Sequence, residues 1–87
     1  MESTFKEVLL EIGYSNIIDN GRELRTRPIY RESSNYTSLS IDKRTGRFKD
    51  FGGDVRGSFE ELVKLSLGLK SLNEAKKWLD GKYVLQS

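Results

Sequence analysis

Neither cysteine nor histidine occurs in this chain of 87 residues. A domain of this size buries only about 60–65% of the surface that its unfolded chain exposes, and small domains often compensate with disulfides or a structural metal. Disulfides, thiolate zinc sites and imidazole chemistry are all excluded here. The chain is long enough for one domain, and its stability must come from an apolar core.

Three amphipathic helices are predicted, each by a capping pattern followed by an apolar stripe. The capping residues and their partners are Thr4 with Glu7, Ser58 with Glu61, and Ser71 with Glu74. The stripes that follow are Phe5, Val8, Leu9 and Ile12, then Phe59, Leu62, Val63 and Leu67, then Leu72, Ala75, Trp78 and Leu79. Gly13, Gly68 and Gly81 are the expected helix ends.

Between the first two helices the pattern changes to short β-prone segments. Asn20-Gly21 and Pro28 break residues 17–42, and residues 37–41 alternate with period two. Residues 42–46 predict a hairpin loop, with Asp42 bonding its own turn and Gly46 at positive φ, followed by a returning strand over 47–51.

This order of elements predicts an α+β fold. We expect a small antiparallel β-sheet with a central hairpin, packed by one N-terminal and two C-terminal helices. We expect a single domain over residues 1–87, with a core over about 4–80 and a tail or linker over 82–87.

The glycine-rich stretch FKDFGGDVRGSFEEL, residues 48–62, is similar to two nucleotide-binding motifs. Residues 52–58 have P-loop spacing, but the lysine is missing and the preceding strand is charged and belongs to a hairpin. Residues 50–52 spell the kinase metal-binding triplet, but the other kinase motifs need a far longer chain. We therefore expect neither activity, and we expect Gly52, Gly53 and Gly57 to shape tight turns.

Charge is unevenly distributed, although the net charge is only +2. Residues 21–56 carry nine Lys and Arg against five Asp and Glu, whereas residues 1–20 carry one Lys against four acids. A basic central segment favours a polyanion partner, and a solvated surface with interspersed charges is the alternative.

Five segments, in order, resemble the N-terminal zinc-ribbon domain of bacterial and phage DNA primases. They are GRELRTRPIY (21–30), SLSI (38–41), GRFKDFGG (46–53), GSFEEL (57–62) and LKSLNEA (69–75). The resemblance covers residues 5–79, and the order and spacing of the segments are more specific than any one motif. It implies a zinc-ribbon-like fold.

The family's four zinc ligands fall on Arg27, Tyr30, Asp50 and Gly53. These residues cannot form a tetrahedral zinc site, so we expect a metal-free variant without a cofactor. We hypothesise that an Arg27–Asp50 ion pair, with Tyr30 packed across it, holds the two strands together instead. An exposed pair contributes only about 0–1 kcal/mol, so the helices must supply most of the stability that zinc would provide.

The resemblance implies a non-catalytic module of a phage or mobile-element DNA primase or replication protein, contacting single-stranded DNA template. The chemistry of those primases lies in a separate domain. A replicative helicase or polymerase is the further candidate partner.

The residues themselves indicate the same kind of ligand. Period-two alternation places Arg25 and Arg27 on one face of a strand over 22–31, and Arg47, Lys49 and Phe51 on one face of the returning strand. If the two faces coincide, they offer cations for phosphates and a ring for base stacking. With the hairpin tip and the residue near the helix start at Ser58, the candidate binding residues are Arg25, Arg27, Lys43, Arg44, Arg47, Lys49, Phe51 and Arg56. Phe48 is expected in the core.

A protein-interaction module is the alternative function. It would dock a helicase, polymerase or host factor through its acidic first helix, with Glu2, Glu7 and Glu11 as the contact face. An enzyme is disfavoured, because no grouping of carboxylates or lysines indicates a catalytic cleft.

We expect a cytoplasmic monomer, and the resemblance implies a phage-infected or element-bearing bacterial host. No apolar run approaches the roughly 18 residues of a membrane span, and the acidic N-terminus does not have the pattern of a signal peptide. We therefore expect no association with a membrane.

Overall fold

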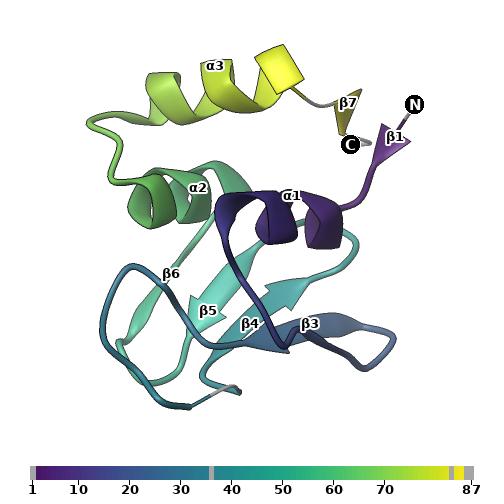
Figure 1. Cartoon of the computed structure of the whole chain (residues 1–87), viewed down its shortest axis with the longest axis vertical. Helices are drawn as coiled ribbons and strands as arrows, with labels where there is room; N and C mark the ends of the chain where they lie inside the picture. The colour runs from purple at the N-terminus through teal and green to yellow at the C-terminus, as the bar shows by residue number, and fades with distance from the viewer. Residues whose placement is uncertain (1, 36, 83, 86–87) are drawn as a thin grey trace.

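The computed structural model describes residues 2–35, 37–82 and 84–85, and for residues 2, 3, 82, 84 and 85 it describes the backbone alone. The elements in chain order are β1 (Glu2–Ser3), α1 (Phe5–Ile12), β2 (Ile18–Asp19), β3 (Glu23–Thr26), β4 (Leu39–Asp42), β5 (Phe48–Asp50), β6 (Val55–Gly57), α2 (Phe59–Leu67), α3 (Leu72–Lys82) and β7 (Val84–Leu85). The predicted α+β fold is confirmed (Figure 1).

Side-chain caps begin the three helices at the predicted positions. The cap bonds run to Thr4 Oγ1 from the Glu7 amide (3.2 Å), to Ser58 Oγ from the Glu61 amide (3.4 Å) and to Ser71 Oγ from the Glu74 amide (3.3 Å). Each bond satisfies an amide that lacks a partner within its helix. Gly13 and Gly68 end α1 and α2 at positive φ, as predicted.

The prediction for the third helix was wrong in two details. α3 continues through Gly81 to Lys82, because Gly81 does not adopt the positive φ with which Gly13 and Gly68 end their helices. Leu72 is 38% exposed, so the inward face of α3 is narrower than its sequence pattern indicates. Ala75 and Leu79 are buried and Trp78 is partly buried.

Five strands form one antiparallel sheet in the order β2-β3-β4-β5-β6. β4 and β5 are the predicted central hairpin: the Asp42 carboxylate accepts from the amides of Arg44 (2.7 Å) and Thr45 (3.2 Å), and Gly46 has φ +79°. β1 and β7 pair with each other in parallel. Of the predicted tail or linker, Lys82 belongs to α3 and residues 84–85 form β7, while residues 83, 86 and 87 lie outside the described residues.

Two strand boundaries differ from the sequence prediction. β3 ends at Thr26, before Arg27 and Pro28, so the expected strand over 22–31 is shorter. The glycine-rich stretch contains an additional strand, β6, because the chain turns at residues 51–54 and returns beside β5. In that turn the Asp54 amide donates to the Asp50 carbonyl oxygen (2.9 Å), and Asp54 has φ +55°.

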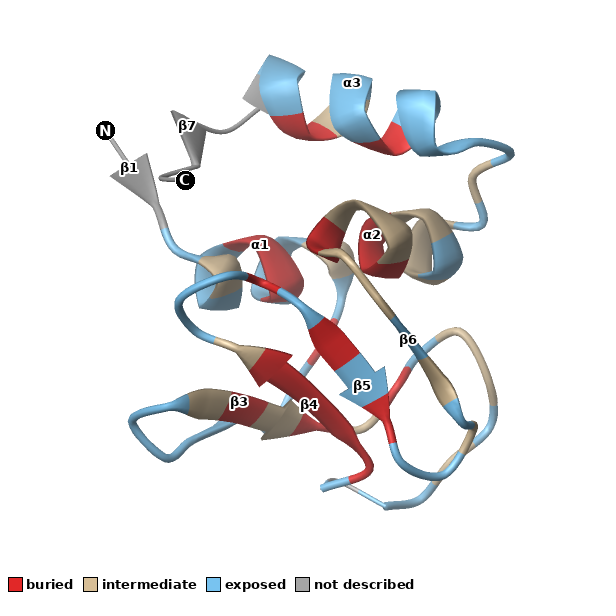
Figure 2. Ribbon diagram, turned by 180° about the vertical axis from the view of Figure 1, so that it is seen from behind, coloured by how far each residue is buried: buried red, intermediate tan, exposed pale blue. Residues whose placement is uncertain are grey.

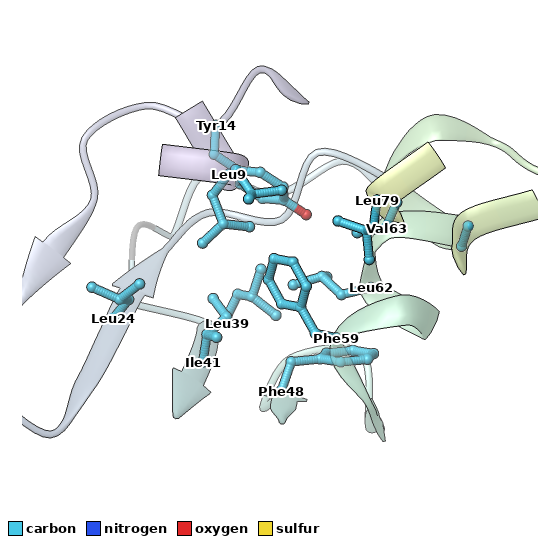
Figure 3. Close-up of a cluster of buried hydrophobic side chains, with 12 residues drawn as sticks. Leu9, Tyr14, Leu24, Leu39, Ile41, Phe48, Phe59, Leu62, Val63 and Leu79 are labelled. Carbon is cyan, nitrogen blue, oxygen red and sulfur yellow. The ribbon is translucent and has the colours of Figure 1, made fainter. Parts of the chain in front are cut away.

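The core lies between the sheet and the helices. α1 and α2 lie over one face of the sheet, and α3 packs on α2 (Figures 1 and 2). The buried apolar side chains of this cluster (Figure 3) are Val8, Leu9, Tyr14, Leu24, Leu39, Ile41, Phe48, Phe59, Leu62, Val63, Ala75 and Leu79. Phe48 is 2% exposed, which confirms its predicted place. Among the described residues no helix covers the opposite face of the sheet, which we call the outer face.

Candidate nucleic-acid interface

The outer face carries a row of side chains across four strands, and three of the four are basic. The strand register aligns Arg25 of β3 with Ser40 of β4, Ser40 with Lys49 of β5, and Lys49 with Arg56 of β6. Directly opposed residues of antiparallel strands point to the same face, and the alternating burial of Leu24, Arg25 and Thr26 shows that this face is the outer one. The row spans three strand spacings, about 14 Å.

Phe51 lies on the outer face beside this row, in the turn that follows β5. Its side chain is 54% exposed, which is uncommon for a phenylalanine in a small domain. The Arg25 guanidinium carbon is 4.8 Å and the Lys49 ammonium nitrogen 5.0 Å from the centre of its ring. Both distances fall within the range of cation–π attraction, so the two cations fix the exposed ring in place.

Arg25 is also held by hydrogen bonds. Its Nε donates to Glu23 Oε1 at 2.8 Å, and its Nη1 donates to the Thr37 carbonyl oxygen at 2.6 Å. Glu23 is in turn bonded by the Ser40 hydroxyl and by the Asn20 amide nitrogen (3.3 Å). The Ser40 hydrogen bond first, and the Arg25 bond second, lower the pKa of the Glu23 carboxyl, so Glu23 is ionised at neutral pH.

Two shallow hollows flank the Lys49–Phe51 segment. One is lined by Arg25, Asn35, Thr37, Ser38, Phe51 and Gly52. The other is lined by Lys49, Asp54, Val55 and Arg56. Part of the outer face is therefore recessed on either side of the exposed ring.

The remaining candidate cations lie away from Phe51. Lys43 pairs with Asp19 of β2 through bonds of 2.8 and 2.9 Å, and Arg44 and Arg47 are exposed at the β4–β5 hairpin. Arg27 lines a separate hollow with Pro28, Ile29 and Arg31. The structure therefore brings together Arg25, Lys49, Phe51 and Arg56, and it places Arg27, Lys43, Arg44 and Arg47 outside that group.

The start of α2 near Arg56 is already occupied by acidic side chains. Glu60 and Glu61 lie in its first turn. A Cβ atom added at Gly57 would lie 2.5 Å from the Glu61 carboxylate. The positive end of a helix dipole attracts either acidic side chains or a phosphate. Here the acidic side chains already provide that negative charge. Arg56 is therefore better placed to act with Lys49 than with the helix.

On the buried side of β5, the carboxylate of Asp50 joins three segments of the chain. Its Oδ2 accepts from the Tyr30 hydroxyl (2.6 Å) and from Arg31 Nε (2.8 Å). Its Oδ1 accepts from Arg31 Nη2 (2.7 Å) and from the Ser38 hydroxyl (3.2 Å). The amides of Gly52 and Gly53 also donate to Oδ1, at 3.1 and 3.0 Å. We call these residues the Asp50 cluster.

The charge of Asp50 is fully compensated within the protein. Asp50 is 0% exposed, and the bidentate Arg31 contact is the strongest geometry for a carboxylate. The Arg31 bonds hold the pKa of Asp50 well below its usual range. Burial, followed by the hydrogen bond to Asp50, raises the pKa of the Tyr30 hydroxyl.

The predicted Arg27–Asp50 ion pair was wrong in one partner. Arg31, four residues further along, makes the pair, while Tyr30 and Asp50 meet as expected. The chain after Pro28 follows an irregular path, so strand alternation does not decide which arginine points inward. Among the described residues no group of three or more acidic side chains lies close enough to hold a metal ion.

Gly52 and Gly53 are required by close approach, and not by a positive φ as in many tight turns. A Cβ at Gly52 would lie 2.6 Å from Arg31 Nη2 and 2.8 Å from the Ser38 hydroxyl oxygen. A Cβ at Gly53 would lie 2.8 Å from Asp50 Oδ2 and 2.9 Å from Arg31 Nε. The two glycines leave the space that the ion pair fills.

Sequence reasoning missed Glu23, Arg31 and Ser38 as parts of these sites. Glu23 and Arg25 are two apart in a strand and therefore share a face, which could have indicated their pairing. No local signal identifies Arg31 or Ser38, because their bonds to Asp50 cross 19 and 12 residues of chain.

Comparisons with protein-family models, curated protein sequences and solved structures return no significant match for this chain. In the part of the chain that the structure describes, no helix has the length and apolar character needed to cross a bilayer.

Proposed function

We propose that this chain is a non-catalytic module that binds single-stranded DNA across the outer face of its sheet. The exposed ring of Phe51, with the cations of Arg25 and Lys49 at 4.8 and 5.0 Å from its centre, carries the proposal. An exposed aromatic ring offers a stacking surface to any base, and adjacent cations pair with the phosphates on either side of it. A duplex would not offer its bases to such a ring, because they are already stacked.

The geometry favours few phosphate contacts. Lys49 and Arg56 are exposed neighbours in the row, and Arg47 is exposed two residues before Lys49 in the sequence. Two or three contacts correspond to a salt slope of about −1.4 to −2.1 for a single strand. Such a module binds weakly alone and is suited to act within a larger replication protein.

Binding of a fluorescein-labelled oligo(dT) 15-mer, followed by anisotropy over a series of salt concentrations, tests the proposal. Phe51→Ala is expected to weaken binding without changing the salt slope. Lys49→Ala is expected to make the slope shallower by about 0.7. Lys77→Ala, which removes one exposed cation from α3, is the matched control. It should change neither the affinity nor the salt slope. Absence of binding at low salt contradicts the proposal.

We further propose that the module derives from the primase zinc-ribbon domain and serves a phage or mobile-element primase or replication protein. Three of the four positions that correspond to zinc ligands support this origin. Tyr30 bonds Asp50, and the Gly53 amide bonds the same carboxylate. Hydrogen bonds around one carboxylate thus join the segments that a metal would join.

Restoring the ligands tests this origin. A variant with Arg27→Cys, Tyr30→His, Asp50→Cys and Gly53→Cys is expected to bind one Zn²⁺ tightly and to be stabilised by it. The same variant with Gly53 retained is the control, since it lacks the fourth ligand. A four-ligand variant that binds Zn²⁺ no better than this control contradicts the proposed origin.

Docking of a protein partner through α1 is the second candidate function. Leu10 is 52% exposed on α1 between the exposed residues Glu7 and Glu11. An exposed leucine flanked by acids favours a basic, partly apolar segment of a helicase or polymerase. Leu10→Lys abolishes such docking and leaves oligonucleotide binding intact, which separates the two functions.

A further inference from the structure

Arg25 is the member of the basic row that the protein itself engages most. A guanidinium binds a phosphate or carboxylate with two parallel hydrogen bonds along one of two edges, Nε with Nη2 or Nη1 with Nη2. Glu23 occupies Nε on the first edge, and the Thr37 carbonyl oxygen accepts from one of the two N–H groups of Nη1. A phosphate therefore cannot make a bidentate contact along the Nε–Nη2 edge of Arg25 as it stands.

Glu23 does not depend on Arg25 for its position. The Ser40 hydroxyl bonds its second carboxylate oxygen, and Asn20 Nδ2 donates to the first at 3.3 Å. Ser40 belongs to the same row across the sheet as Arg25. A negative charge is thus held at the edge of the guanidinium that points onto the outer face.

We propose that Glu23 is an internal competitor for the phosphates of the bound strand. The backbone phosphate displaces the Glu23 carboxylate from Nε of Arg25 and takes the Nε–Nη2 edge. The side chains of Arg25 and Glu23 are 29% and 30% exposed, so the exchange needs no unfolding. This inference rests on the proposed binding of single-stranded DNA to the outer face.

The competitor has a consequence for selectivity. A DNA strand that also stacks a base on Phe51 can replace the single hydrogen bond between Arg25 Nε and Glu23, because the stacking adds to the free energy of binding. An isolated anion gains no stacking and must displace Glu23 without that help. The outer face should therefore respond to polynucleotides more strongly than to inorganic phosphate.

Glu23→Gln tests the proposal, because it removes the charge and keeps the shape and the acceptor for Ser40. With the labelled oligo(dT) 15-mer, we expect this variant to bind several-fold more tightly than the wild type. Its salt slope should stay close to that of the wild type, because a phosphate contacts Arg25 in both bound proteins. Asp80→Asn removes one exposed negative charge from α3, away from the outer face, and should change neither quantity.

The same substitution in an Arg25→Ala background isolates the competition. There Glu23→Gln is expected to give a smaller gain in affinity and no change of slope. In the wild type, the Nε–H resonance of Arg25 should shift when the oligonucleotide is added, which tests the exchange even if a variant fails to fold.

Three outcomes overturn the proposal. Weaker binding by Glu23→Gln means that Glu23 only positions Arg25 over the ring. An Arg25 resonance that does not move when the wild type is saturated means that no exchange takes place. If neither the wild type nor Glu23→Gln binds at low salt, the proposed function itself fails and the competitor with it.

Discussion

Lys49, Asp50 and Phe51 are consecutive, yet they belong to two regions of opposite character. Asp50 is fully buried, and both of its carboxylate oxygens receive hydrogen bonds from the protein. Lys49 and Phe51 are exposed on the other side of the same strand and its turn, where they contact each other. The difference shows how one short segment can hold the fold together and present a binding surface.

The two regions also use charge differently. In the Asp50 cluster the charge is surrounded by donors, which is what makes a buried carboxylate tolerable. On the outer face, cations outnumber the nearby acids, and Phe51 is 54% exposed. Substitutions on the buried side should therefore change stability, and substitutions on the outer face should change binding.

The largest expected effect comes from exchanging the two phenylalanines of β5 and its turn for alanine, one at a time. Phe48→Ala leaves a cavity in the core and should lower the free energy of unfolding by about 3–5 kcal/mol. Phe51→Ala should leave that free energy nearly unchanged and weaken oligonucleotide binding by about 1–3 kcal/mol. Urea denaturation and anisotropy measure the two effects. Equal destabilisation by both variants would contradict the division between the two regions.

Removing the Asp50 carboxylate is the next largest change. Asp50→Ala leaves Arg31, the Tyr30 hydroxyl and two glycine amides without their acceptor, and should destabilise the fold by about 3 kcal/mol. Asp80→Ala on the exposed face of α3 is the control for the loss of one negative charge. A melting temperature of Asp50→Ala equal to that of the wild type would rule out a stabilising role for the cluster.

A smaller effect is expected from adding one methyl group beside the cluster. Gly53→Ala places a Cβ against Asp50 and Arg31, so the ion pair must shift, and the fold should lose about 1–3 kcal/mol. Gly81→Ala is the matched control, because its Cβ meets no atom within 4 Å. In a helix this change should instead stabilise the protein by up to about 1 kcal/mol. Thermal unfolding of both variants checks the opposite signs.

The smallest expected effect is the change in stability with pH near neutrality. The folded state holds the pKa of Asp50 below its value in the unfolded chain, about 3.9. The unfolded chain therefore takes up a proton first as the pH falls, and the native state loses stability. The melting temperature should change little through Asp50 between pH 7 and about pH 5 and should fall below about pH 4. A variant with Asp50→Asn should show a shallower acid loss.

Much of the fold could be predicted from the sequence, because the signals were local. Thr4, Ser58 and Ser71 cap helices at the expected places, and Asp42 with Gly46 forms the expected hairpin loop. Strand β6 could not be predicted in this way. It is only three residues long, ends in glycine and is defined by pairing with β5.

The candidate sites were predicted in part. Alternation correctly placed Lys49 and Phe51 together, and the strand register then added Arg25 and Arg56 to the same face. The choice of Arg31 over Arg27 depends on the path of the chain after Pro28, which no local pattern specifies.

The contact between Arg31 and Asp50 also bears on the order of events in folding. The β4–β5 hairpin joins neighbours in sequence, whereas the Arg31–Asp50 pair closes a loop across 19 residues. Local hairpins form early. Contacts that close longer loops form later, because closing a longer loop costs more conformational entropy. The ion pair should therefore form after the transition state, so that it mainly lowers the rate of unfolding and changes the rate of folding little. In this small domain, a single buried carboxylate would then govern how long the native state persists more than how fast it is reached.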